Sequence, residues 1–141
     1  MNAVRTVLAA VTMAVALGAA SASAQSFVAV DQDGQRNGTA VAQVGAANGA
    51  VVTQNGNDNQ GIARQNGNRT RALIRQHGNR NSAAIDQSGN GNRGMILQFG
   101  NGHDATLVQN GRGDMAVIQT PNGTRVVPTD HVYARTLSLF H

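Results

Sequence analysis

The side chains best placed for chemistry in this chain are the carboxamides of a repeated glutamine. Gln-x-Gly occurs eight times, each copy 11 residues after the last, with glutamines at Gln32, Gln43, Gln54, Gln65, Gln76, Gln87, Gln98 and Gln109. A carboxamide has two donor hydrogens and an acceptor oxygen, and burying it without partners costs roughly a few kcal/mol. The regular spacing therefore predicts hydrogen bonding between identical stacked amides, as in the polar ladders of cross-β assemblies.

The histidines and the absence of cysteine argue against a catalytic or metal-binding site. The four histidines are His77, His103, His131 and His141, and the first two occupy different columns of the repeat. They would not converge as metal ligands or as a base and its orienter. The chain has no cysteine, so it offers neither thiolate ligands nor disulfides. We therefore expect no enzyme activity, no catalytic or metal site and no cofactor.

Aligned copies of the repeat indicate the strands that position the glutamines. The residue seven places after each glutamine is small, in a column that runs from Thr39 to Ala116. The residue nine places after each glutamine is apolar. Positions seven, nine and eleven alternate with the period of a strand that has one face inward. The expected apolar core is Val41, Val52, Ile74, Ile85, Ile96, Leu107 and Ile118.

Glycine and asparagine mark the turns between these strands, because both tolerate left-handed backbone. The expected turn glycines are Gly34, Gly45, Gly56, Gly67, Gly78, Gly89, Gly100 and Gly111. The expected turn asparagines, three residues after the glycines, are Asn37, Asn48, Asn59, Asn81 and Asn92; Thr70, His103 and Asp114 take this place in the other copies. A helix is disfavoured because each glycine would cost about 1 kcal/mol relative to alanine.

Two units of 11 residues make one coil, and stacking the coils aligns like residues. We expect an all-β fold, a cross-β β-solenoid of about four 22-residue strand–turn–strand coils. One glutamine ladder would contain Gln32, Gln54, Gln76 and Gln98, and the other Gln43, Gln65, Gln87 and Gln109. Outward charges alternate from coil to coil at Arg36, Asp58 and Arg80, which suits an in-register stack.

The first 24 residues have the pattern of a signal peptide. Arg5 precedes an apolar stretch over 7–20, and Ala-Ser-Ala at 22–24 predicts cleavage between Ala24 and Gln25. The apolar stretch is shorter than the roughly 20 residues of a membrane span. The expected plan is a signal peptide (1–24), a short N-terminal segment (25–31), the solenoid (32–119) and a non-repeat tail (120–141). The tail could be a flexible end, a cap over the last coil or a docking segment.

Charge and aromatic content argue against a nucleic-acid partner. The formal net charge is +4 and aromatic residues make up only 3% of the chain. A mild basic excess without a stacking platform is a weak argument for nucleic acid. The sequence therefore predicts no nucleic-acid partner.

The pattern Gln-x-Gly-x-x-Asn-x-Ala-x-Ile-x-Gln resembles the curlin repeat of bacterial curli fibres, and residues 76–87 match it at every defining position. The resemblance implies a subunit of extracellular functional amyloid that adds end to end at the bacterial cell surface, for adhesion and biofilm matrix. It also implies other curli-type subunits, an outer-membrane secretion pore and periplasmic chaperones as partners. The unbroken rhythm is more similar to the minor, nucleating subunit than to the major one.

Three departures from the family pattern stand out, and the first is the replacement of the turn asparagine by Thr70, His103 and Asp114. Residues 25–31 are shorter than the targeting segment that curli subunits usually carry before the first repeat. Gln119 follows Gln109 by ten residues rather than 11, so we expect the register to slip there and the repeat to end.

Other solenoid functions fit less well. A calcium solenoid needs carboxylates in one column, but the aspartates occupy different columns. An ice-binding face needs a threonine ladder, which Thr39, Thr53, Thr70 and Thr106 do not form. A carbohydrate module would want exposed aromatics, and only Phe99 lies within the repeats. The alternative to a fibre subunit is a non-polymerising secreted β-solenoid that serves as a binding module or surface adhesin.

Overall fold

The computed structural model describes residues 12–17 and 26–128, and every regular element in them is a strand. The strands are β1 (Thr12–Leu17), β2 (Phe27–Asp33), β3 (Gly38–Val44), β4 (Gly49–Asn55), β5 (Gln60–Asn66), β6 (Arg71–His77), β7 (Ser82–Ser88), β8 (Arg93–Phe99), β9 (Asp104–Asn110), β10 (Asp114–Thr120) and β11 (Gly123–Val127). The predicted all-β fold is confirmed. Within the same residues, no helix is long and apolar enough to cross a membrane.

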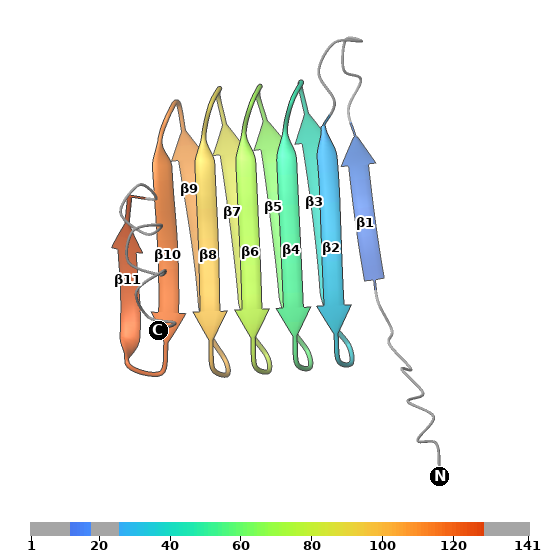
Figure 1. The fold of residues 1–141 in the computed structure, drawn as a ribbon, viewed down its shortest axis with the longest axis vertical. Helices are drawn as coiled ribbons and strands as arrows, with labels where there is room; N and C mark the ends of the chain where they lie inside the picture. Colours follow the sequence, from blue (N-terminus) through green and yellow to red (C-terminus); the bar gives the residue numbers. More distant parts are fainter. Residues whose placement is uncertain (1–11, 18–25, 129–141) are drawn as a thin grey trace, which may run out of the picture.

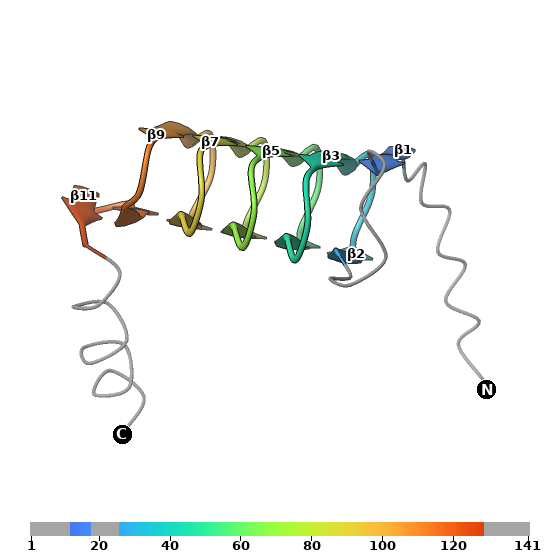
Figure 2. The ribbon, with the colours of Figure 1, turned by 90° about the horizontal axis from the view of Figure 1, so that it is seen from above.

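The strands form two facing sheets, and the chain changes sheet at nearly every turn (Figures 1 and 2). The odd sheet has the order β1-β3-β5-β7-β9, and the even sheet has the order β2-β4-β6-β8-β10-β11. From β2 to β10, each strand pairs in parallel with the strand two places on, so that Gln54 lies beside Gln76. These stacked parallel strands form about four turns of a β-solenoid, as predicted.

The space between the sheets is filled by the apolar column of the repeat. Val52, Ile74, Ile85 and Ile96 are almost fully buried. Small residues in the neighbouring column let the sheets approach: a Cβ added to Gly94 would lie 2.9 Å from the amide nitrogen of Gln87. The two sheets are therefore held close by tight packing of small and apolar side chains in a thin core.

Ile118 lies outside the core, and its predicted core position is wrong. The turn before β10 covers only 111–113, one residue fewer than the other turns of the repeat. The shorter turn moves Val117 into the apolar column beside Ile96, where it is 7% exposed. Ile118 pairs with Leu97 and packs in an outer cluster with Met95 and Ala116.

The strand register does not slip at Gln119, contrary to the expectation. The missing residue is absorbed entirely in the turn, and Gln119 lies beside Gln98 in the even sheet. The amide of Gln98 donates to Gln119 Oε1 at 2.7 Å. The even ladder therefore continues for one strand more than the eight copies of Gln-x-Gly provide.

The strand array is wider than residues 32–119 at both ends. β2 begins at Phe27, and its Val30 lies beside Val52 in the column of the repeat. At the other end, β11 pairs antiparallel with β10. β1, within the expected signal peptide, pairs in parallel with β3, so its removal would leave β3 as the edge of the odd sheet. The cleavage site expected between Ala24 and Gln25 and most of the tail lie outside the described residues.

Candidate functional site: the glutamine ladders and the turns

The repeated glutamines form two continuous ladders between the sheets. In the odd ladder, Nε2 of each glutamine donates to Oε1 of the next: Gln43 to Gln65 at 2.7 Å, Gln65 to Gln87 at 3.0 Å and Gln87 to Gln109 at 2.8 Å. In the even ladder, Gln32 donates to Gln54, Gln54 to Gln76 at 2.8 Å, and Gln76 to Gln98 at 2.8 Å. The ladder glutamines from Gln43 to Gln98 are at most 2% exposed. Their amide groups therefore exchange water for identical neighbours.

The second hydrogen of the glutamine amide ties the two sheets together. Gln76 on β6 donates to the backbone carbonyl of Gln60 on β5 at 2.8 Å, and Gln98 on β8 donates to that of Ser82 on β7 at 2.7 Å. Gln43, Gln54, Gln65, Gln87 and Gln109 make the same contact 16 residues back along the chain. Sequence reasoning missed this contact, because residue columns do not reveal the direction of backbone carbonyls.

The turn asparagines in the fifth position after glutamine bridge neighbouring coils. Asn59 Nδ2 donates to the carbonyl of Gly78 at 2.8 Å, and Asn59 Oδ1 accepts from the backbone N–H of Asn81 at 3.0 Å. Asn37, Asn48 and Asn81 make the same pair of contacts. Thr70 retains part of the pattern, because its hydroxyl donates to Asn48 Oδ1 at 2.9 Å.

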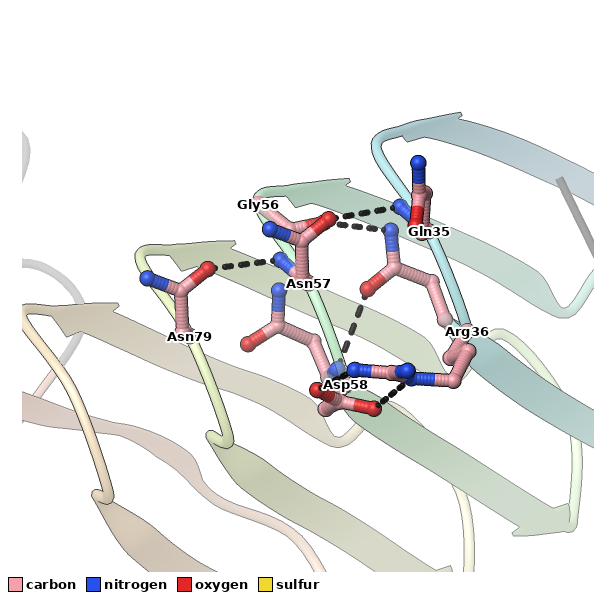
Figure 3. Close-up of polar contacts among 8 residues, drawn as sticks. Gln35, Arg36, Gly56, Asn57, Asp58 and Asn79 are labelled. Atoms are coloured by element: carbon pink, nitrogen blue, oxygen red, sulfur yellow. Dashed lines mark hydrogen bonds and ion pairs between the residues drawn. The ribbon is translucent and has the colours of Figure 1, made fainter. Parts of the chain in front are cut away.

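A second asparagine ladder, which sequence reasoning missed, runs along the surface of the turns (Figure 3). Asn57 Oδ1 accepts from the backbone N–H of Gln35, and Asn79 Oδ1 accepts from that of Asn57, both at 2.9 Å. On the other edge of the solenoid, Asn68 and Asn90 accept in the same way from Ala46 and Asn68. The 22-residue spacing of these asparagines was a visible signal for the ladder.

The turn glycines are required by both conformation and space. Gly56 has φ 122° and Gly78 has φ 125°, which lie in the region that side chains rarely adopt. A Cβ on Gly56 would lie 1.9 Å from the carbonyl oxygen of Gly78. Each of these glycines therefore allows the backbone of one turn to contact that of the next.

The outward charges follow the register of the stack. Arg36 Nη2 donates to Asp58 Oδ2 at 2.7 Å across one rung (Figure 3). This hydrogen bond lowers the pKa of Asp58 from its ordinary value and raises the pKa of Arg36. Arg64 lies beside Asp86, whereas Arg71 lies beside Arg93. The stack therefore places both opposite and like charges on neighbouring strands.

Replacing Asp58 with asparagine is expected to remove a small, pH-dependent part of the stability. Because the folded pKa of Asp58 is lowered, its stabilisation is present above the unfolded pKa of about 3.9 and is lost as the pH falls through the folded value. Unfolding by urea at low ionic strength, where the exposed pair is not screened, should therefore differ between the unchanged chain and Asp58→Asn at neutral pH and converge in acid. A difference that grows in acid would contradict this assignment.

The two ends of the ladders differ. At the N-terminal end, Gln32 Oε1 and Gln43 Oε1 are buried and accept no hydrogen bond from the described residues. At the C-terminal end, the amides are occupied by the chain itself: Gln109 Nε2 donates to the carbonyl of Gly113 at 3.0 Å, and Gln119 Nε2 to that of Asp104 at 2.8 Å. Unsatisfied glutamine acceptors of the two ladders therefore lie at the N-terminal end, where an incoming strand could supply the donor.

The remaining polar side chains do not assemble a reactive site in the described part of the chain. His77 ends β6, while His103 precedes β9 and its Nε2 lies 3.0 Å from the carbonyl oxygen of Phe99. No group of three or more histidine, cysteine, aspartate or glutamate side chains there could hold a metal ion. The described polar contacts are structural ones within and between coils.

Comparison with known proteins gives one match. Residues 78–111 match the family model of the curlin associated repeat, a family of structural subunits. The search of curated proteins found no match, and neither did the search of solved structures. The matched residues run from the turn before β7 to the turn after β9, where the ladder, the turn glycines and the turn asparagines are all present. The match thus shows a curlin associated repeat over these residues.

Proposed function

We propose that the mature chain is a structural subunit of extracellular curli-like fibres, and that fibre growth uses its N-terminal end. The observation that carries this proposal is the buried glutamine acceptor on the edge strand β2, Gln32 Oε1. Gln43 Oε1 on β3 becomes the second such acceptor once removal of the signal peptide takes β1 away. A buried acceptor without a donor costs about 1–3 kcal/mol. A strand added beyond β2 or β3 in the same register would supply the missing amide donor and extend both the sheet and the ladder.

The other end is less suited to in-register addition, because β11 covers the even sheet. β11 is antiparallel and places Thr124 beside Gln119, where a stacked copy would place another glutamine. The Gln119 amide lies 3.4 Å from the Thr124 hydroxyl. Addition of a copy at this end requires β11 to leave β10. A subunit that accepts others at one end and is blocked at the opposite end fits a nucleating role.

A chain truncated after Thr120 is expected to polymerise on its own faster than the full mature chain, because β10 becomes an open parallel edge. Thioflavin fluorescence of the two proteins at equal concentration measures the difference, and we expect the lag time to fall severalfold. A chain truncated after Pro128, which keeps β11 (Gly123–Val127), is the control. An unchanged or longer lag in the truncated chain would contradict the capping role of β11.

Fibre formation itself is tested with the purified mature protein, alone and with its own preformed fibres as seeds. We expect seeded growth and fibre diffraction with a strand spacing of about 4.7–4.9 Å along the fibre axis. If the full and truncated chains both stay monomeric with seeds, the chain is instead a non-polymerising secreted binding module or adhesin.

The cellular role follows from the same proposal. The fibres would lie at the bacterial cell surface and serve adhesion and biofilm matrix, with other curli-type subunits, a secretion pore and periplasmic chaperones as partners. Deleting the gene separates two roles: loss of all fibres indicates a bulk subunit, and unattached fibres or secreted, unpolymerised partner subunit indicate a nucleator.

A further inference from the structure

The two long edges of the solenoid, which are formed by its turns, carry different charge. The turns that follow even strands contain Arg36, Asp58 and Arg80, in alternation. The turns that follow odd strands, with the strand starts beside them, contain Arg69, Arg71, Arg93 and Arg112, against Asp114 alone. We call this second edge the basic edge. Arginine and aspartate alternate on the opposite edge, whereas arginine predominates on the basic edge.

The arginines of the basic edge surround a hollow of about 470 Å³. Its lining consists of Arg69, Arg71, Arg93, Arg112, Asp114, Ala47 and Gly91. Ala47 and Gly91 occupy the turns on either side of the turn that contains Arg69. Because these two residues are small, the surface beside the Arg69 side chain is concave. All four arginines are exposed. The hollow therefore presents guanidinium groups to solvent from several successive coils.

The charges in this hollow are poorly compensated within the described residues. Arg71 and Arg93 lie side by side on β6 and β8, and like charges directly opposite are destabilising. The nearest carboxylate contact is a 3.4 Å pair between Arg93 Nη1 and Asp114 Oδ2. Arg69 also holds a left-handed backbone with φ 59°, which asparagine or glycine would adopt at less cost. An anionic ligand would offset the repulsion between the arginines.

A second hollow of about 330 Å³ adjoins the first and shares Ala47 and Arg69 with it. Its other lining residues are Ala46, Asn68 and Asn90. The Oδ1 atoms of both asparagines already accept backbone N–H groups at 2.8 Å. Their Nδ2 groups donate no hydrogen bond within the described part of the chain and suit hydroxyl oxygens. The hollow lined by four arginines thus continues into a smaller one, which shares Arg69 and adds the amides of Asn68 and Asn90.

We propose that these two hollows form a groove that binds an acidic polysaccharide, with carboxylates of uronate residues held by the arginines. Guanidinium groups bind carboxylates in bidentate fashion, and the amide-lined hollow fits the hydroxyls of a neighbouring sugar. The groove contains no aromatic side chain, which disfavours single-stranded nucleic acid and neutral sugars that bind by stacking. The groove is complete in one subunit, and fibres would present it repeatedly, so that avidity adds to each weak contact.

The test measures binding of the mature chain to immobilised polygalacturonate, with neutral dextran and duplex DNA as comparison surfaces. The diagnostic variant is Arg69→Gln with Arg71→Gln, and the matched control is Arg80→Gln with Arg75→Gln. Both pairs remove two exposed charges, and Arg69 and Arg80 share the left-handed turn conformation. We expect binding to polygalacturonate but not to dextran, a dissociation constant about tenfold higher for the diagnostic variant, and little change for the control.

The proposal is overturned if polygalacturonate does not bind, or if both variants weaken binding equally, since general attraction to a basic protein then suffices. Tighter, groove-dependent binding to DNA would make nucleic acid the partner and would overturn it as well. Arg112→Gln is a second diagnostic variant in case the double substitution disturbs folding. It should weaken binding about threefold at low ionic strength and less at high salt.

Discussion

Gly78→Ala is expected to prevent the mature chain from forming a stable solenoid. The added Cβ would lie 1.9 Å from the carbonyl oxygen of Gly100 on the next coil, and Gly78 has φ 125°. The same carbonyl accepts a 2.9 Å hydrogen bond from Asn81 Nδ2, so the backbone cannot withdraw without breaking this contact. Overpacking and backbone strain together predict a loss of about 4 kcal/mol.

Gly102→Ala is the matched control for this experiment. Gly102 also has a positive φ, of 69°, but a Cβ there meets nothing within 4 Å. Its cost should be about 1 kcal/mol, from conformation alone. Guanidinium unfolding followed by far-UV circular dichroism measures both variants, and thioflavin fluorescence reports assembly. If Gly78→Ala is no more harmful than Gly102→Ala, the close contact between turns is not a determinant of the fold.

Gln76→Leu is the substitution with the second-largest expected effect. Leucine is similar in size, but it would leave Gln98 Oε1 and one of the two amide hydrogens of Gln54 without a partner, and it would remove the donor to the carbonyl of Gln60. Each unpartnered group costs about 1–3 kcal/mol, partly offset by the greater hydrophobicity of leucine. We expect a net loss of about 2–4 kcal/mol and markedly slower assembly.

Gln60→Leu is the control that tests whether the effect of Gln76→Leu comes from the buried ladder position rather than from the loss of any glutamine. Gln60 is exposed at the start of β5, and only its backbone carbonyl takes part in the cross-sheet contact. The two Gln→Leu variants are compared by guanidinium unfolding and by seeded growth. Equal behaviour would show that the buried ladder contributes no more than surface glutamines do.

Much of this fold could be predicted because its residues obey one period. Strict alternation between Ala72, Ile74 and Gln76 gives the inward face of a strand, and the 22-residue repeat then aligns the glutamines. The prediction failed where the period was broken. Counting nine residues on from Gln109 placed Ile118 in the core, whereas the short turn at 111–113 shifts Val117 into that position.

The ends of the array were harder to predict because they lack the full motif. Most of β2 precedes the first Gln-x-Gly, although Val28, Val30 and Gln32 already alternate as in the repeat. β11 departs from the parallel rule, since Pro121-Asn122-Gly123 reverses the chain after β10. Proline and glycine at such positions favour a tight turn. The cross-sheet contacts of the amides depend on where backbone carbonyls point, which no column of residue types records.

The uniform direction of the glutamine ladders makes the stack electrically polar. Every amide in both ladders donates toward the C-terminal end and accepts from the N-terminal end. β-Sheets themselves have only small net dipoles, whereas aligned amide dipoles add head to tail, as peptide dipoles do in a helix. The N-terminal end is therefore the negative pole, and two such ends repel each other. Copies that meet in solution are thereby biased toward one relative orientation before any strand has paired.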